Sequence, residues 1–185
     1  SLGAKEINYD SYHEIAYLHQ KYFKPSLSIY EKLGIDTDST FFIVRFVSWN
    51  ASHDYGQKRL SETQKIEIIY ELSKHGKVFI SSEKKIIEAL EKFKIPIPPS
   101  QIHHALAHAK LFVGEGATMA SECAILGTPA IYINDLQAGS IDDQEKNGLL
   151  YHISPGDDII RKIKELLANK NINYETKLRR DELLS

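Results

Sequence analysis

Residues 111–133 read LFVGEGATMASECAILGTPAIYI, and this stretch decides the fold. It opens on a short apolar run of the kind seen in strands buried on both faces, and two glycines interrupt that run. Thr118–Leu126 is rich in small residues and stops at Gly127, which predicts a helix closed by a C-terminal glycine. Pro129–Ile133 is apolar again and predicts the next strand. The stretch is therefore typical of a strand–helix–strand unit in a parallel sheet.

The same alternation extends along the chain on both sides of this unit. Phe41–Val47 and Val78–Ile80 predict earlier strands, and Leu149–Tyr151 predicts an edge strand. Between the first two strands, Ser61 and the glutamine three residues later form a capping-box pattern, and the helix that it opens is expected to end at Gly76. Further helices are predicted over residues 26–33, 86–93, 101–109, 141–147 and 156–169.

This order of elements predicts the fold class and the domain limits. Strands that alternate with helices through short crossovers predict an α/β, Rossmann-like three-layer domain with a parallel sheet over residues 41–170. Residues 1–40 do not follow the alternation and are expected to form an inter-domain connector with a lead-in helix. Residues 171–185 are charged and are expected to form a C-terminal tail that packs elsewhere or frays.

Charge and cysteine content exclude several classes of protein. The chain has 185 residues, a formal net charge of -2 and a pI of about 6.4, so no basic excess indicates nucleic-acid binding. No apolar run approaches the roughly 18 residues of a membrane-spanning helix. Cys123 is the single cysteine and has no partner for an internal disulfide, which fits a reducing cytoplasm. We expect its side chain to be a small buried hydrophobe.

The most informative candidate site follows the strand in residues 111–133. Ligands of open parallel sheets bind beyond the carboxyl ends of the strands. There, residues 114–118 (GEGAT) lead into a helix whose first N–H groups and positive dipole end suit a diphosphate. Glu122 lies about one turn further on, where a carboxylate can accept two hydrogen bonds from ribose hydroxyls. Alternatively, the small residues serve strand–helix packing and Glu122 is a solvated helix residue.

Several segments carry a resemblance to a known family. They are residues 17–19 (YLH), 23–25 (FKP), 43–49 (IVRFVSW), 79–83 (FISSE), 97–99 (IPP), 102–103 (IH) and 113–130 (VGEGATMASECAILGTPA). Together they resemble the C-terminal half of the uncharacterised glycosyltransferase-like family related to UDP-N-acetylglucosamine 2-epimerase. The resemblance covers nearly all of residues 12–155, in order. Gln20, where proline is expected, and Glu115, where aspartate is usual, depart from the family pattern.

The resemblance implies a GT-B architecture of two Rossmann-like domains, in which the C-terminal domain binds a nucleotide-diphosphate sugar. A UDP-sugar is the donor it favours, and the N-terminal domain of the same protein is the partner it implies. Gly116, Ala117 and Thr118 fall on the turn whose backbone meets the diphosphate, and Glu122 falls on the ribose-binding glutamate. Ser121 stands where the family pattern has the first glutamate of a pair, so no role specific to that glutamate carries over.

A second group of candidates ends or follows the first predicted strand. Arg45 can bind a phosphate bidentately and Ser48 can add a hydroxyl, or Arg45 can pair with an acidic neighbour and brace the loop. Trp49 can stack on a sugar or base, although a lone Trp after a strand is more often part of the core. His53 and Asp54 can order this loop or touch the donor.

A third group lies in the proline-bounded segment 96–103, which resembles the part of GT-B proteins that clamps the base. Ile102 or His103 is expected to pack on the base, unless the segment is a plain connector. Ser82 can face the same cleft or serve as the N-cap of a helix. His104 and His108 share a predicted helix face, but no further ligand has suitable spacing, so we expect no metal site and no cofactor.

The expected function is the donor-binding half of a glycosyltransferase, in which Arg45 and the backbone of residues 116–118 steady the leaving diphosphate. The acceptor base is expected from the N-terminal domain, so this chain alone is expected to be inactive. An isomerase half of the epimerase kind shares the same pocket and remains an alternative. A non-catalytic nucleotide-binding or interaction domain is the third possibility. The sequence does not determine the base, sugar, acceptor or oligomeric state.

Overall fold

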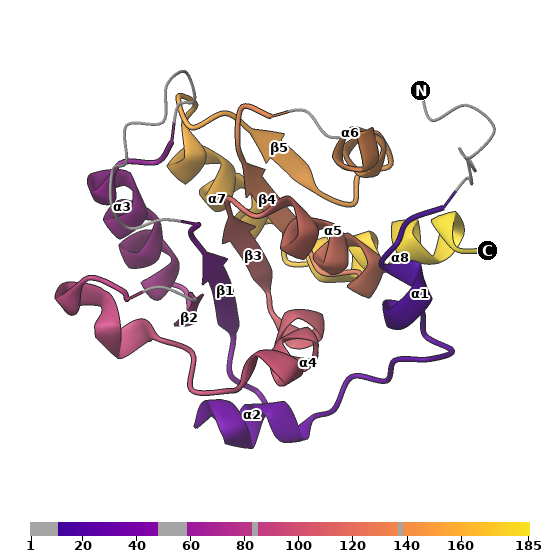
Figure 1. Cartoon of the computed structure of the whole chain (residues 1–185), viewed down its shortest axis with the longest axis horizontal. Helices are drawn as coiled ribbons and strands as arrows, with labels where there is room; N and C mark the ends of the chain where they lie inside the picture. The colour runs from indigo at the N-terminus through magenta and orange to yellow at the C-terminus, as the bar shows by residue number, and fades with distance from the viewer. Residues whose placement is uncertain (1–10, 48–58, 83–84, 137–138) are drawn as a thin grey trace.

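The computed structural model describes residues 11–47, 59–82, 85–136 and 139–185. These segments contain a five-stranded sheet in the order β2-β1-β3-β4-β5, in which every neighbouring pair is parallel (Figure 1). The strands are β1 (Phe41–Arg45), β2 (Lys77–Ser81), β3 (Leu111–Gly114), β4 (Ala130–Ile133) and β5 (Tyr151–Ile153). The prediction of an α/β fold with a parallel sheet is confirmed, and the last strand lies at an edge as expected.

Successive residues of a strand enter two different cores, because side chains alternate between the faces of a sheet. In β1, Phe41 and Ile43 join one apolar cluster, whereas Phe42 and Val44 join the other. All of these side chains are fully buried, so the strand needs an apolar residue at each of these positions. This explains why the central strands read as continuous apolar runs and not as alternating ones.

Helices cover both faces of the sheet and complete the three layers. The first face carries α1 (Ile15–Leu18), α2 (Ser28–Leu33), α4 (Ile102–His108), α5 (Ala117–Leu126) and α6 (Gly139–Lys146). The second face carries α3 (Glu62–Ser73), the 3₁₀ helix η2 (Glu88–Phe93) and α7 (Ile159–Ala168). A 3₁₀ turn, η3 (Pro99–Gln101), leads into α4, and α8 (Ile172–Leu183) follows α7. Among the helices in the described segments, none combines the length and apolar character needed to cross a bilayer.

The start of α3 is as predicted, but the role of the glycine after it is not. Ser61 Oγ accepts from the Gln64 N–H (3.2 Å) and the Ser61 N–H donates to Gln64 Oε1 (3.0 Å), so the capping box is formed. The helix ends at Ser73, and Gly76 lacks the left-handed conformation of a helix-terminating glycine. A Cβ on Gly76 would lie 2.4 Å from the Thr40 carbonyl oxygen, so close backbone approach requires glycine there.

The sequence predicts the end of α5 correctly but not the type or the start of the helix over residues 86–93. Gly127 closes α5 with a φ of 74°, so the predicted C-terminal glycine is confirmed. Residues 86–93, predicted as an α-helix, form the tighter helix η2, which starts only at Glu88. The chain must become extended again at Lys94, where it bridges Ile80 of β2, and this leaves room for little more than a short 3₁₀ segment.

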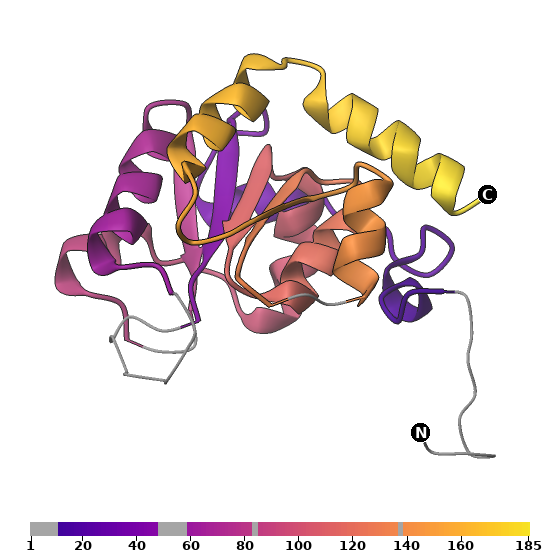
Figure 2. The same ribbon diagram turned by 90° about the horizontal axis from the view of Figure 1, so that it is seen from above.

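The residues after 170 form α8, which packs on α5. Ile172 and Thr176 are buried, so one side of this charged helix contributes to the core. Arg180 Nη1 donates to the Leu126 carbonyl oxygen (3.0 Å), which pairs an acceptor that the C-terminal end of α5 leaves open. The far end of α8 lies near α1, where Gln20 Nε2 donates to Asp181 Oδ1 over 2.9 Å (Figure 2).

Candidate functional site

The strand register brings the ends of three strands to one point. Arg45, the last residue of β1, pairs with Ser81 of β2 on one side and with Gly114 of β3 on the other. A Cβ on Gly114 would lie 2.5 Å from the Arg45 carbonyl oxygen, so glycine allows β3 to approach β1 this closely. The segment that opens α5 therefore starts directly beside Arg45.

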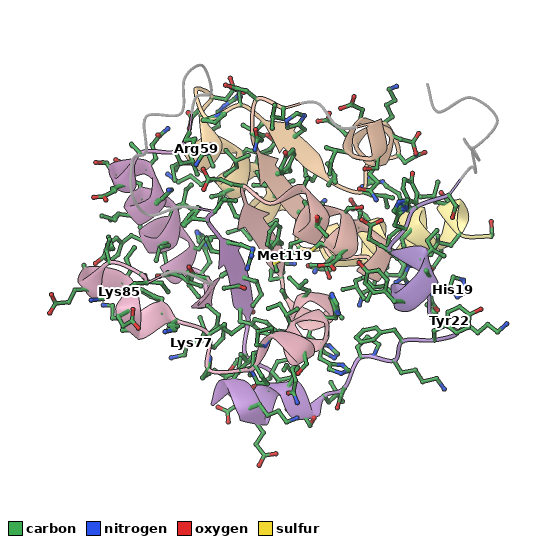
Figure 3. All side chains as sticks on the ribbon, in the orientation of Figure 1. His19, Tyr22, Arg59, Lys77, Lys85 and Met119 are labelled. Atoms are coloured by element: carbon green, nitrogen blue, oxygen red, sulfur yellow. The ribbon has the colours of Figure 1, made fainter. Side chains whose placement is uncertain are left out.

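A cavity of about 500 Å³ lies at this carboxyl edge of the sheet, within the usual size range of small-molecule sites. Met119, which lines the cavity and is labelled in Figure 3, lies near the middle of the molecule in the first turn of α5. Ser48 and Trp49, like His53 and Asp54, lie outside the described residues. The other eight residues predicted for the site all line the cavity: Arg45, Ser82, Ile102, His103, Gly116, Ala117, Thr118 and Glu122.

The first turn of α5 leaves backbone N–H groups open at the cavity. Gly116 is the N-cap residue and has no side chain with which to cap the helix. Among the hydrogen bonds of the described residues, Ala120 N–H donates to the Gly116 carbonyl (3.2 Å), and none starts at the N–H of Ala117, Thr118 or Met119. Unpaired donors and the positive end of the helix dipole therefore border the cavity.

Gly116 differs from Gly114 in what a side chain would meet. A Cβ on Gly116 would lie 3.9 Å from Arg45 Cδ and 4.0 Å from Arg45 Nε, which is ordinary van der Waals contact. The φ of -95° at Gly116 is also open to any L-residue. The packing of the protein does not require glycine at this position, and the space next to Arg45 remains open to a ligand.

The Arg45 side chain is held at this space by a contact with the neighbouring strand. Its Nη1 donates to Ser81 Oγ over 3.3 Å, and Ser81 itself is buried at the end of β2. A guanidinium is permanently charged, so this contact fixes a positive charge beside the open amides of α5.

Glu115 braces the end of β1, a role that the sequence analysis missed. Its Oε2 accepts from the Val47 N–H (3.1 Å) and lies 3.8 Å from Lys65 Nζ of α3. Both charged side chains are almost fully buried, and burial lowers the pKa of the Lys65 ammonium while the Glu115 carboxylate opposes that shift. Glu115 does not line the cavity and instead holds the start of the loop after β1.

Glu122 lines the cavity but is buried and held by two other side chains. Its Oε1 accepts from the Tyr17 hydroxyl (3.0 Å) and lies 2.9 Å from His103 Nε2. The alternative of a solvated helix residue is therefore wrong. Burial of the Tyr17 hydroxyl end, together with the Glu122 carboxylate, raises the pKa of Tyr17, so the phenol stays protonated and donates its hydrogen bond.

Tyr17 holds Glu122 in the wall of the cavity, and the sequence patterns do not predict this role. It belongs to α1, which packs on α5, although 105 residues separate it from Glu122 in sequence. The sequence predicts its segment, residues 1–40, as an inter-domain connector with a lead-in helix. The one available signal was that residues 17–19 carry part of the family resemblance, which points to similarity but not to a contact.

Another wall of the cavity is mostly apolar. It is formed by the residues that precede and begin α4, namely Ile95, Ile97, Pro98, Pro99 and Ile102. Ser82 also borders the cavity but is not a helix cap, because η2 starts at Glu88 with Ile87 as its N-cap. The predicted alternative of Ser82 as an N-cap is therefore wrong.

Two histidines of α4 and the cysteine contribute to packing away from the cavity. His104 Nδ1 accepts from the Ser26 N–H (3.1 Å), and its ring stacks on Phe23 with centroids 4.9 Å apart. Burial lowers the pKa of both His104 and His108. Cys123 is buried as predicted, and burial raises the pKa of its thiol, so it is an unreactive core residue. Within the described segments, no cluster of three or more His, Cys, Asp or Glu is placed to hold a metal ion.

Comparison with solved structures gives remote similarities to a glycotransferase and to a polymerase. The glycotransferase of kitacinnamycin has a TM-score of 0.47 and 16% identity over 76% of this chain and 38% of that chain. The wall teichoic acid polymerase TagF has a TM-score of 0.49 and 13% identity over 84% of this chain and 40% of that chain. The chain thus spans about two-fifths of the length of these structures. Comparison with curated proteins gives no match.

The family comparison covers nearly the whole chain. A family model described as "Protein of unknown function (DUF354)" matches residues 2–184. The match includes α1 and α8 as well as the sheet, so Tyr17 lies within the same family unit as the cavity that it supports. The chain therefore belongs to the DUF354 family of proteins of unknown function.

Proposed function

We propose that this chain is the donor-binding half of a glycosyltransferase and that its cavity holds a nucleotide-diphosphate sugar. The observation that carries the proposal is the convergence of three groups on one cavity: the open first turn of α5, the Arg45 guanidinium and the Glu122 carboxylate. The first two suit the negative charge of a diphosphate, and the third suits the hydroxyl groups of a ribose.

The diphosphate is proposed to lie against the first turn of α5, in the space between Gly116 and Arg45. The net charge of the chain is -2, so bulk charge does not attract a phosphate and local donors must do so. Open amides and a guanidinium supply such donors, and each charge-assisted hydrogen bond contributes about 1.5–3 kcal/mol. The small side chains of Gly116 and Ala117 let the phosphate oxygens reach the backbone.

The nucleoside is proposed to extend from the diphosphate along the cavity. Glu122 lies in the second turn of α5 and takes the ribose, while the apolar wall around Ile102 takes the base. A flat base gains from contact with the rigid prolines of this wall, because little chain entropy is lost on binding. A UDP-sugar is the donor that we favour.

The chemistry follows from the position of the positive groups. During transfer, negative charge grows on the leaving diphosphate as the glycosidic bond breaks. Arg45 and the amides of α5 stand in place beforehand, so they stabilise this charge without reorganising. The acceptor and its base are proposed to come from an N-terminal half of the protein, so this chain is expected to bind the donor without turning it over.

The test is isothermal titration of the protein with UDP, GDP, CMP and dTDP, for wild type and for Arg45→Lys. Lysine keeps the charge but loses the bidentate geometry, so affinity for the preferred nucleotide should fall roughly tenfold. Arg161→Lys, on the exposed side of α7, is the matched control and should bind as wild type does. Absence of binding by every nucleotide, or equal binding by the two variants, contradicts the proposal.

A second assay separates transfer from isomerisation. Release of free nucleotide diphosphate that depends on an added acceptor supports transfer. Interconversion of two nucleotide sugars without an acceptor would instead support an isomerase that uses the same cavity.

A further inference from the structure

Two side chains hold the same oxygen of Glu122. The Tyr17 hydroxyl donates to Oε1 over 3.0 Å, and His103 Nε2 lies 2.9 Å from that oxygen. The two rings also contact each other, with centroids 5.7 Å apart. Tyr17 belongs to α1 and His103 to α4, and both of these helices pack on α5. The carboxylate is therefore fixed from two independent elements of the fold.

This arrangement leaves the second carboxylate oxygen for a ligand. An ionised carboxylate oxygen accepts about two hydrogen bonds, so Tyr17 and His103 fill Oε1. Among the described residues, no hydrogen bond or ion pair reaches Oε2. Glu122 is buried as a residue yet lines the cavity, and Oε2 is not among the described side-chain atoms that are shut off from solvent without a partner, so this oxygen is accessible. A hydroxyl group of a bound ligand can therefore reach Oε2 and donate a hydrogen bond to it.

We propose that Tyr17 and His103 are positioning residues that present Oε2 of Glu122 to the ribose of the donor, so that α1 helps to set the preference for ribose over deoxyribose. This inference rests on the proposed function, because it requires a nucleotide in the cavity. Tyr17 acts through Glu122 and does not need to touch the ribose. A carboxylate held in one orientation selects a hydroxyl more sharply than one that is free to rotate.

A purely structural role for Tyr17 would give a different result. In that case its hydrogen bond would only anchor α1, which is also held by the buried Leu18 and by the bond from Gln20 to Asp181. Those contacts remain when the hydroxyl alone is removed, so Tyr17→Phe is expected to fold. Its melting temperature, compared with that of the wild type, checks this expectation.

The experiment compares ribose with deoxyribose ligands on three proteins. Wild type, Tyr17→Phe and Tyr22→Phe are titrated with UDP, GDP, ADP and CDP and with the 2′-deoxy and 3′-deoxy forms of each. Tyr22 is the matched control, because it lies on the same N-terminal segment but is exposed and far from Met119 and the cavity (Figure 3).

The expected result is a loss of discrimination and not a general loss of affinity. Wild type should bind at least one ribonucleotide more tightly than a deoxy form, and Tyr17→Phe should reduce that preference roughly three- to tenfold, which corresponds to one hydrogen bond. Tyr22→Phe should retain the preference of the wild type. If Tyr17→Phe weakens ribose and deoxyribose ligands equally, or changes neither, the inference is overturned and the proposed function stands.

Three further outcomes complete the test. If wild type binds no nucleotide, the proposed function fails and the inference fails with it. If Tyr17 acts through Glu122, the double variant Tyr17→Phe/Glu122→Gln should show the same ribose preference as Glu122→Gln alone, and additive losses would overturn the inference. Should Tyr17→Phe melt below the assay temperature, His103→Ala removes the other bond to Oε1 and is expected to show the same loss of preference.

Discussion

Gly114 and Gly116 lie two positions apart, and alanine is expected to act on stability at the first and on binding at the second. Gly114→Ala would place a methyl group 2.5 Å from the Arg45 carbonyl oxygen and 2.8 Å from Phe112 Cζ. The first of these atoms is backbone in the middle of the sheet, so it moves only if the pairing of β1 with β3 is disturbed. Overpacking of this kind costs about 1–3 kcal/mol, which lowers the melting temperature by roughly 2–12 °C.

Gly116→Ala is expected to leave stability almost unchanged. Its methyl group meets Arg45 Cδ at 3.9 Å, which is an ordinary contact, and the φ of -95° suits alanine. Replacing glycine lowers the entropy of the unfolded chain and stabilises by about 0.4–1 kcal/mol. Alanine is a poorer N-cap than glycine, which destabilises by a similar amount. The two effects offset each other, so the melting temperature should stay within roughly 4 °C of wild type.

The same methyl group is expected to weaken nucleotide binding. It occupies the space beside Arg45 where we place the diphosphate, and it moves the phosphate oxygens away from the Ala117 and Thr118 N–H groups. Loss of one charge-assisted hydrogen bond costs about 1.5–3 kcal/mol, so the Kd for UDP should rise roughly ten- to hundredfold.

Isothermal titration with UDP and thermal melting followed by circular dichroism test both parts. The binding argument is refuted if Gly116→Ala binds UDP as tightly as wild type while melting at the same temperature. The packing argument is refuted if Gly116→Ala loses as much stability as Gly114→Ala. The pair thus separates a glycine that the fold requires from one that the ligand requires.

Two predictions concern stability alone. Burial lowers the pKa of His104 and His108, so the unfolded chain binds more protons than the folded chain as the pH falls through about 6.5. The melting temperature should therefore fall as the pH drops from about 7 toward 5, less steeply for His108→Gln, and an equal slope for that variant would contradict this assignment. Arg180→Ala removes the bond to the Leu126 carbonyl and should lower the free energy of unfolding by about 1 kcal/mol in urea titrations. Arg161→Ala, on the exposed side of α7, is its control and should change little.

The strands and the cavity wall along β3 and α5 are predictable because their causes are local. Phe41–Val44 are apolar without interruption, since both faces of β1 are covered. Gly116 and Thr118 follow a strand and open a helix, and the parallel sheet then determines which edge they occupy. The end of the helix after Ser61 is less predictable. A glycine can be required either by a left-handed helix cap or by close approach of another backbone segment, and the sequence does not distinguish the two causes. At Gly76 the second cause applies.

The support of Glu122 is not predictable from sequence patterns, because its causes are distant. The bond from Tyr17 joins residues 105 positions apart, and nothing in the local pattern around Tyr17 indicates a partner. The same holds for Arg180, whose partner Leu126 lies 54 positions away at the end of another helix. Charged residues near a chain end suggest a tail that packs elsewhere or frays, and only the buried Ile172 and Thr176 show that α8 packs on the domain.

The anchoring of α5 at its C-terminal end affects how its N-terminal end can bind a ligand. Ala120–Leu126 are buried without interruption, and Arg180 closes the carboxyl terminus of the helix. A helix clamped in this way resists tilting, so its amino-terminal donors keep their direction whether or not an anion is present. A pyrophosphate would then bind to a preorganised surface. Most of the conformational entropy lost on binding would be lost by the ligand and not by the protein.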